Sequence, residues 1–176
     1  MSSYSIYSLE QYFKVYRKSV NKPKKFWGKI AENNFTWYQK WDKVVEFDMQ
    51  KAEFVWYKNA KLNITKNCID RHLANRGDKK AIIFEPNNPD EPSRFFTYSE
   101  LYTEVSKMAN VLRDQGVKKG DRVCIYLPMI PELVFTVLAC ARIGAIHSVI
   151  FAGFSANALS TRINDCNAKV IITADG

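Results

Sequence analysis

Apolar and polar residues change period clearly in the second half of the chain. A short apolar run, Val123 to Leu127, predicts a β-strand that ends at Pro128, because proline has no N–H to donate to a sheet. Apolar residues then recur at helical spacing from Pro131, which suits a first helical turn, to Gly144, which favours a helix C-terminus. The apolar positions of this helix are Leu133, Val134, Val137, Leu138 and Ala141.

A second apolar run, Ala145 to Phe151, follows this helix directly. A strand, a helix and a strand with short connections form a right-handed parallel unit. Ser155 is a candidate cap for a further helix, with Leu159 and Ile163 inward, and 169–173 is a last strand. Because parallel sheets bind ligands beyond the carboxyl ends of their strands, two loops are of interest, 127–131 and 152–155.

The middle of the chain predicts a hairpin and a capped helix. Two β-rich runs, Lys80–Glu85 and Arg94–Thr97, flank a loop with three prolines and are expected to pair. Thr97 and Glu100 have the spacing of a capping box, and the helix that follows ends at Gly116. Its apolar face consists of Leu101, Val105, Met108, Ala109 and Leu112.

The segment 63–77, NITKNCIDRHLANRG, predicts one helix, with Asn67 as its cap and Gly77 at its end. It begins with Asn63-Ile64-Thr65, a glycosylation sequon, which matters only in a secreted protein. Cys68 and His72 are four residues apart and could both touch a metal. Two ligands do not make a zinc site, so a core cysteine and a hydrogen-bonded histidine are favoured.

Residues 1–62 hold all four tryptophans and form a separate compositional block. Three short helices are predicted there, around 8–16 (capped by Ser8), 26–30 and 37–41. A basic cluster interrupts them: Lys22, Lys24, Lys25 and Lys29. A docking face of buried aromatic rings with a solvated lysine turn is favoured over stacking on single-stranded nucleic acid, because no RNA-binding signature accompanies the cluster.

Composition narrows the class of protein. The 176 residues carry a formal net charge of +8, which fits an anionic ligand, a nucleic acid or solubility alone. The four cysteines have no close pairing, which indicates a reducing, intracellular compartment. The longest apolar stretch, 133–151, contains an arginine, a glycine and a histidine, so a buried helix and strand explain it better than a membrane span. No secretory signal is evident at the N-terminus.

Few residues of the chain carry recognisable chemistry. Glycine-rich phosphate loops, a nucleophile elbow and metal motifs are not found. Glu132 stands at a helix start, where a role toward the helix dipole is favoured over catalysis. His147 lies in an apolar run and is expected to be a buried, satisfied histidine. The turn 151–155 is either an anion site of free backbone N–H groups or an ordinary tight turn capped by Ser155.

The predicted strands and helices make half of a doubly wound parallel sheet. The last strand, with Val170-Ile171-Ile172-Thr173 at its centre, has no helix after it to cover an apolar face. Such strands are normally buried on both faces, and an uncovered face promotes aggregation. We therefore expect further protein beyond Gly176.

Three parts of the sequence resemble a known family. The stretch 120–176, the segment Trp56–His72 and the lead-in Phe95-Phe96-Thr97-Tyr98 with Leu101 are similar to AMP-forming acetyl-CoA synthetases of the adenylate-forming superfamily. The resemblance implies an α/β fold in which a short helical aromatic-rich block (1–62) precedes a β-hairpin and the βαβαβ units of a doubly wound sheet. Residues 63–176 would begin the AMP-binding domain and stop before its phosphate loop.

The resemblance also implies a reaction and its participants. Acetate and ATP, with Mg²⁺, would give an acetyl-adenylate and pyrophosphate, and CoA would then give acetyl-CoA and AMP. The catalytic residues of such enzymes lie beyond Gly176, so none is placed in this chain, and the missing C-terminal part would be its partner. Neither nucleic acid nor membrane is expected as a partner, and the location implied is cytoplasmic. Propionate or another short acid is an alternative substrate. An inactive fragment that serves only as a binding module is an alternative role. A third alternative, a small nucleic-acid-binding protein, is suggested only by the charge.

One turn of this chain carries a site residue by resemblance. Similar synthetases place a Gly-Gly pair against the CoA nucleotide, at positions that correspond here to Ala152 and Gly153. Ala152 adds a methyl group where backbone would approach ligand, while Gly153 keeps the conformationally permissive residue. The pair Asn59-Ala60 likewise replaces glycines that are common in the family's N-terminal signature, which we expect to affect a turn and not the chemistry.

Overall fold

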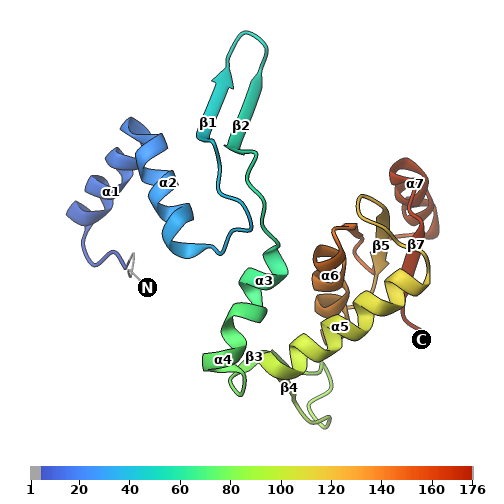
Figure 1. Ribbon diagram of the computed structural model, residues 1–176. Helices are drawn as coiled ribbons and strands as arrows, with labels where there is room; N and C mark the ends of the chain where they lie inside the picture. The colour runs from blue at the N-terminus through green and yellow to red at the C-terminus, as the bar shows by residue number, and fades with distance from the viewer. Residues whose placement is uncertain (1–4, 176) are drawn as a thin grey trace. The chain divides into compact units, whose positions relative to one another are not determined.

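A computed structural model describes residues 5–175 and divides the chain into two compact units, one ending at Leu62 and the other beginning at Asn63 (Figure 1). The first unit contains helices α1 (Leu9–Asn21) and α2 (Pro23–Asn34) and strands β1 (Lys43–Asp48) and β2 (Glu53–Lys58). The expected cap of α1 is confirmed, because the Ser8 hydroxyl accepts the Gln11 N–H at 3.1 Å.

The first unit is less helical than its sequence indicated. The expected third helix at 37–41 is wrong, since this segment is irregular and makes one isolated bridge, Gln39 to Lys61. The Trp37 indole donates to the Ala31 carbonyl at 2.9 Å, and its ring lies 5.2 Å from that of Trp41. These contacts hold the segment in its irregular conformation. An antiparallel hairpin, β1–β2, follows, which the sequence reasoning missed.

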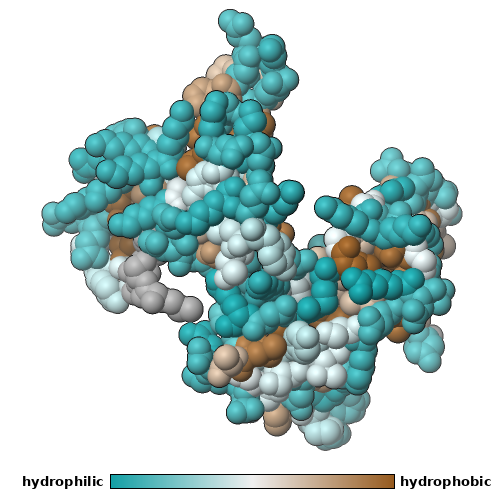
Figure 2. All heavy atoms as spheres, viewed as in Figure 1, coloured by the Kyte–Doolittle hydropathy of each residue, from teal (hydrophilic) through white to brown (hydrophobic). Residues whose placement is uncertain are grey.

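Helix α1 exposes most of its apolar face. Of its residues 9–21, none is buried, and the exposed apolar side chains include Leu9, Tyr12, Phe13, Tyr16 and Val20. On the one face that Figure 2 shows, the surface over α1 and α2 is mostly hydrophilic, with smaller hydrophobic patches. The expected docking face of buried aromatics is therefore wrong for α1 in this unit: its rings reach solvent.

In the second unit, the predicted helix 63–77 is broken into three pieces: α3 (Ile64–Cys68), a 3₁₀ turn η1 (Asp70–His72) and α4 (Leu73–Arg76). Asn63, and not Asn67, is the cap, because its Oδ1 accepts the Thr65 N–H at 2.8 Å. The Asn63 amide also donates to the carbonyls of Ala141 and Arg142, at 3.0 and 3.1 Å. Buried Thr65 donates to the Leu138 carbonyl at 3.0 Å. The sequon residues thus dock α3 on a distant helix.

The hairpin and long helix are as predicted. Strands β3 (Lys80–Phe84) and β4 (Arg94–Thr97) pair antiparallel, and α5 (Tyr98–Asp114) follows. The capping box is confirmed: the Thr97 hydroxyl accepts the Glu100 N–H at 3.2 Å, and the Glu100 carboxylate accepts the Thr97 N–H at 2.7 Å. Four of the five expected apolar positions of α5 are buried, and Met108 is partly buried.

The described residues form a parallel sheet of three strands in the order β6-β5-β7. These are β5 (Arg122–Tyr126), β6 (Ile146–Val149) and β7 (Val170–Thr173), connected by α6 (Pro131–Ile143) and α7 (Ala156–Cys166). Gly144 ends α6 in the left-handed conformation, with a φ of 77°, as its position predicted. The predicted parallel strand–helix–strand unit is confirmed.

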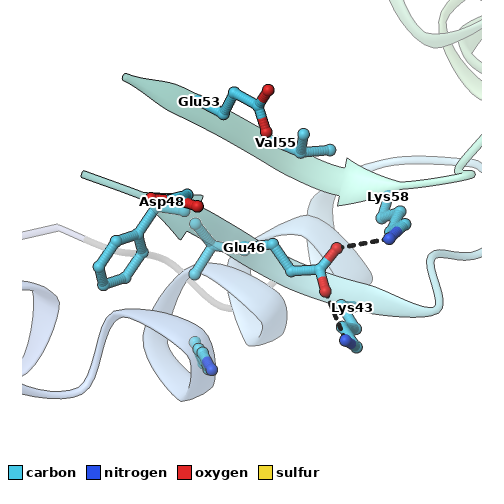
Figure 3. Close-up of a pocket in the computed structure, with 9 residues that line it drawn as sticks. Lys43, Glu46, Asp48, Glu53, Val55 and Lys58 are labelled. Atoms are coloured by element: carbon cyan, nitrogen blue, oxygen red, sulfur yellow. Dashed lines mark hydrogen bonds and ion pairs between the residues drawn. The ribbon is translucent and has the colours of Figure 1, made fainter. Parts of the chain in front are cut away.

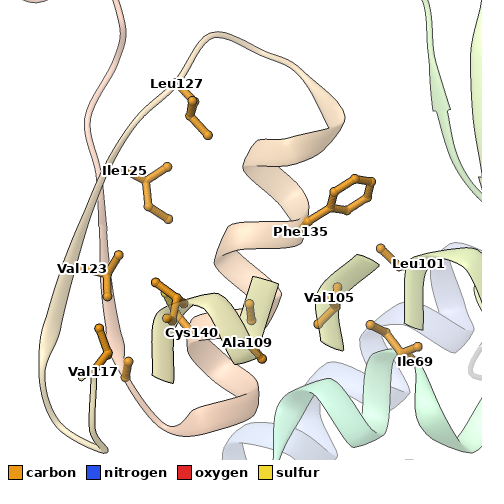
Figure 4. Close-up of a cluster of buried hydrophobic side chains, with 13 residues drawn as sticks. Ile69, Leu101, Val105, Ala109, Val117, Val123, Ile125, Leu127, Phe135 and Cys140 are labelled. Atoms are coloured by element: carbon orange, nitrogen blue, oxygen red, sulfur yellow. The ribbon is translucent and has the colours of Figure 1, made fainter. Parts of the chain in front are cut away.

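The core of this unit lies around β5 and the side-by-side helices α5 and α6 (Figure 4). Val123, Cys124 and Ile125 of β5 are completely buried. The buried face of α6 differs from the expected one: it includes Phe135, Thr136, Ala139 and Cys140, whereas Val134 is 36% exposed. Three of these residues, Thr136, Ala139 and Cys140, are small, which allows α5 and α3 to pack closely against this helix.

The two outer strands leave apolar side chains in solvent. Ile146 of β6 is 54% exposed and Ile171 of β7 is 45% exposed. Ile146 is in register with Arg122 of β5, and Ile171 is in register with Cys124. Because residues two apart on a strand lie on the same face, Ile146 and Ile171 share one face of the sheet. Within residues 5–175, no helix is both long and apolar enough to cross a membrane.

Candidate functional site

The turn from Phe151 to Ser155 leads from the carboxyl end of β6 into α7. The Tyr126 hydroxyl, at the end of the neighbouring strand β5, donates toward two of its carbonyls, those of Ala152 at 2.7 Å and Phe154 at 3.0 Å. The Phe154 N–H donates to the Phe151 carbonyl at 3.0 Å. The Ser155 hydroxyl accepts the Ala158 N–H at 3.3 Å, which confirms the predicted cap of α7. These bonds give the turn a defined backbone.

Gly153 occupies this turn for a reason of space. Its φ lies outside the left-handed region, so the backbone conformation of the turn does not itself require glycine. A Cβ at this position would lie 2.6 Å from Cε1 of the Phe151 ring, which is too close for two carbons. The Phe151 ring therefore fills the space that a larger side chain would need.

Aromatic and basic side chains surround the turn. The rings of Phe151 and Phe154 meet edge to face at 5.9 Å, and the Arg162 guanidinium lies 4.6 Å from the centre of the Phe154 ring. Phe151 is 69% exposed. Exposed rings beside a cation and free backbone N–H groups can contact a ligand that combines a flat ring with negative charge.

The other loop singled out by the topology, 127–131, is a strand exit and a helix entry. Leu127 and Pro131 are buried, and Met129 between them is 80% exposed. Glu132 lies in the first turn of α6 as predicted, and its carboxylate pairs with the Arg94 guanidinium of β4 at 3.1 Å. This ion pair and the helix position give Glu132 a structural role.

The two histidines do not form a catalytic site. His147 is exposed, contrary to the expectation that it is buried, because β6 is an outer strand of the sheet. His72 lies 5.4 Å from the Tyr98 ring, and partial burial, with the nearby Arg71 and Arg76 cations, lowers its pKa. Cys68 is exposed and not the core residue that was favoured. Among residues 5–175, no group of three or more metal-ligating side chains is found.

A pocket of about 600 Å³ lies on the β1–β2 hairpin of the first unit (Figure 3). Its central carboxylate, Glu46, pairs with Lys43 and with Lys58, the latter at 2.7 Å. Hydrogen bonds from these two lysines lower the pKa of Glu46 to about 2. The pair also raises the pKa of Lys58. Because both lysines pair with it, the Glu46 carboxylate stays ionised and is not poised to act as a general acid.

Asn59 explains part of the departure from the family's glycines. Its φ of 63° is left-handed, a conformation that asparagine tolerates almost as glycine does. The Ala60 N–H donates to the Tyr57 carbonyl at 2.9 Å, and the Asn59 amide donates to Asp42 at 2.7 Å. The substitution falls in a turn, as expected.

Family models match both parts of the chain. Residues 12–68 match the acetyl-coenzyme A synthetase N-terminus, and residues 69–176 match the AMP-binding enzyme family. The chain belongs to the AMP-binding enzyme family. The second match includes the whole Phe151–Ser155 turn, so this turn lies within the region that matches the family. The resemblance identified from the sequence is confirmed.

Curated relatives of this chain are named acetyl-coenzyme A synthetases. The one from Magnetococcus marinus is 53% identical over 167 residues, which cover 95% of this chain and 26% of that protein. The one from Rhodobacter capsulatus is 52% identical, over 94% of this chain and 25% of the relative. Acetyl-coenzyme A synthetase 2 of Pseudomonas aeruginosa is 49% identical, over 94% and 26%. The chain thus spans about a quarter of the length of these relatives.

Tyr126 is the residue of this site that sequence reasoning missed. It lies within the apolar run 123–127 and is therefore interpreted from the sequence as part of a buried strand. The available signal was its position, since a polar-tipped side chain at the carboxyl end of a parallel strand points toward the ligand edge of the sheet.

Proposed function

We propose that this chain is the N-terminal quarter of an acetate–CoA ligase. Such an enzyme joins acetate to CoA through an acetyl-adenylate, with ATP as the source of the adenylyl group. The observation that carries the proposal is an identity of about half of all residues with acetyl-coenzyme A synthetases across both units, together with the match to the N-terminal family model. This identity is too extensive to reflect the fold alone.

The reaction has two steps with defined bond changes. A carboxylate oxygen of acetate attacks the α-phosphorus of ATP, and pyrophosphate leaves with the electrons of the broken P–O bond. The CoA thiolate then attacks the carbonyl carbon of the acetyl-adenylate, and AMP leaves. Binding the charged reactants in line supplies most of the rate enhancement in reactions of this type.

The contribution of this chain lies in the second step. We propose that the turn containing Ala152 and Gly153 lies against the nucleotide end of CoA. The exposed rings of Phe151 and Phe154 and the Arg162 cation support this assignment. No residue between 5 and 175 is assigned to acyl transfer itself.

Mg²⁺ is expected to accompany ATP in this reaction. Among residues 5–175 no three His, Cys, Asp or Glu side chains lie together, and Mg²⁺ that accompanies ATP is held mainly by phosphate and water oxygens, so no ligand for it is assigned in this chain. We therefore derive no step through the metal from this chain. The protein is proposed to act in the cytoplasm on small-molecule substrates, and its four free cysteines support a reducing compartment.

The test is pyrophosphate exchange into ATP, measured with the full-length protein that carries this sequence. Exchange that depends on acetate, in the absence of CoA, is the expected result. Exchange with propionate but not acetate would correct the substrate, and no exchange with any short acid would refute the ligase. The 176 residues alone are expected to support no exchange, and activity from them would contradict our assignment of catalysis to other parts of the enzyme.

A further inference from the structure

The Tyr126 hydroxyl lies between two carbonyl oxygens of the candidate CoA turn. It is 2.7 Å from the Ala152 oxygen and 3.0 Å from the Phe154 oxygen. A tyrosine hydroxyl has one proton to donate, so the two carbonyls share it. The side chain starts at the end of β5, whose preceding three residues are completely buried. The hydroxyl is therefore carried by a strand whose preceding residues are fixed in the core of the unit.

This contact determines where two N–H groups of the turn point. In a planar trans peptide the C=O and the N–H point in opposite directions, and the described residues contain no cis peptide bond. When the Ala152 carbonyl points toward Tyr126, the Gly153 N–H points away from it. The Phe154 carbonyl fixes the Ser155 N–H in the same way. Both donors are thus turned to the side opposite the tyrosine.

Neither of these N–H groups is used within the protein. Among residues 5–175, the N–H groups of Gly153 and Ser155 have no hydrogen-bond acceptor. Both residues are exposed. Between them, the Phe154 N–H is occupied by the Phe151 carbonyl. The turn therefore presents two free N–H donors, whose peptide planes are held by the Tyr126 hydroxyl on the opposite side.

We propose that Tyr126 is a positioning residue for CoA, which holds the Gly153 and Ser155 N–H groups toward a phosphate oxygen at the nucleotide end of the cofactor. The inference rests on the proposed function, since it concerns the same turn. It adds a residue outside the turn and a chemical role for the backbone, namely donation to an anionic oxygen. Tyr126 itself does not touch the reacting atoms.

The experiment compares Tyr126→Phe with wild type in the full-length enzyme. The variant keeps the ring and removes the hydroxyl, so the turn is free to rotate its peptide planes. We expect the KM for CoA to rise about three- to tenfold, which corresponds to one net hydrogen bond, with kcat at saturating CoA unchanged. Acetate-dependent pyrophosphate exchange, which needs no CoA, is expected to stay at the wild-type rate.

Two comparisons make the result specific. Tyr102→Phe is the matched control, because the Tyr102 hydroxyl makes no hydrogen bond within residues 5–175 and Arg142 contacts only its ring. Pantetheine, which lacks the nucleotide, is the second acceptor substrate. Tyr126→Phe should leave the kcat/KM for pantetheine unchanged. An equal loss with pantetheine and CoA would overturn the assignment to the nucleotide end.

A second pair of variants tests the N–H groups without Tyr126. Ser155 has a φ of −64°, which proline adopts, so Ser155→Pro removes one N–H with little backbone change. Ser155→Ala loses the same helix cap but keeps the N–H. We expect a higher KM for CoA in S155P than in S155A. Equal KM values for CoA in S155P and S155A, or a wild-type KM in Y126F, would overturn the inference. The proposed ligase function would still hold if the wild type catalyses acetate-dependent pyrophosphate exchange. A wild type without this exchange would overturn both the inference and the proposed function.

Discussion

Asn63 is the side chain on which the entry into the second unit depends. Its Oδ1 caps α3 by accepting the Thr65 N–H, and its Nδ2 donates to the carbonyls of Ala141 and Arg142 at the end of α6. One half-buried amide therefore serves the start of one helix and the end of another. Asn63→Ala removes all three bonds, and Asn63→Asp removes only the two donations.

The size of the effect follows from these partners. Loss of an N-cap costs about 1 kcal/mol. The Ala141 carbonyl retains the Gly144 N–H at 3.3 Å, so its loss is small, whereas the Arg142 carbonyl loses a donor worth about 1 kcal/mol. We expect Asn63→Ala to lower the free energy of unfolding by about 2–3 kcal/mol.

Asn63→Asp is the sharper variant. It keeps the cap, but it places a carboxylate against two carbonyl oxygens at the negative end of a helix, where an anion is unfavourable by about 0.3–1 kcal/mol. We expect a loss of about 1–2 kcal/mol, smaller than that of Asn63→Ala because the cap is kept. Equilibrium urea unfolding of the protein, followed by far-UV circular dichroism, measures both. Asn157→Asp, in the exposed first turn of α7, is the control and should stay within about 0.5 kcal/mol of wild type. An Asn63→Asp variant as stable as wild type would refute the role of the donated bonds.

Two further predictions concern single ionisable groups. The folded pKa of Glu46, about 2, lies below its ordinary value of 4.5, so its stabilising effect is present above about pH 4.5 and is lost as the pH falls toward 2. The difference in melting temperature between wild type and Glu46→Gln should therefore shrink across this range, and a constant difference would contradict the ion-pair argument. Burial raises the pKa of Cys140 to about 11, and that of Cys124 is raised too, whereas Cys68 is exposed. Iodoacetamide followed by mass spectrometry should label Cys68 first in the native protein, and labelling of Cys140 at a similar rate would show that the core of this unit opens readily.

The elements predicted correctly are those with local signals at both ends. Ser8, Thr97 and Gly144 each begin or end a helix through contacts within a few residues, so the sequence nearby is sufficient. The parallel unit around β5 was predictable for the same reason, because punctuation by glycine and proline separates an apolar strand from a helix with its own period. Such features need no knowledge of the tertiary fold.

The errors involve residues whose state is decided by distant partners. The β1–β2 hairpin exposes rings such as Phe47 and Phe54, so no buried face imposed a clear alternation on its sequence. The helix predicted from 63 to 77 is interrupted at Ile69, which has a φ of −121° and is completely buried in the core formed with distant residues. His147 is exposed because β6 is an outer strand, which depends on strand order and not on the composition of the run.

The candidate site likewise has one part that the sequence predicts and another part that depends on distant contacts. The loop after β6 could be identified because the carboxyl ends of parallel strands are where such sheets bind ligands. The support of that loop by Tyr126 could not, since the hydroxyl reaches carbonyls 26 and 28 residues along the chain. The ring of Phe151 over Gly153 is likewise a matter of side-chain placement within the turn.

The position of β5 between β6 and β7 has a consequence for the order in which the sheet assembles. The two outer strands do not pair with each other, so each joins the sheet only through β5. Val123 pairs with His147, 24 residues away, and with Val170, 47 residues away. Closing the longer loop costs about 0.6 kcal/mol more chain entropy, because the cost grows with the logarithm of length. The β5–β6 pair, which leads into the turn 151–155, is therefore favoured to form before β7 docks.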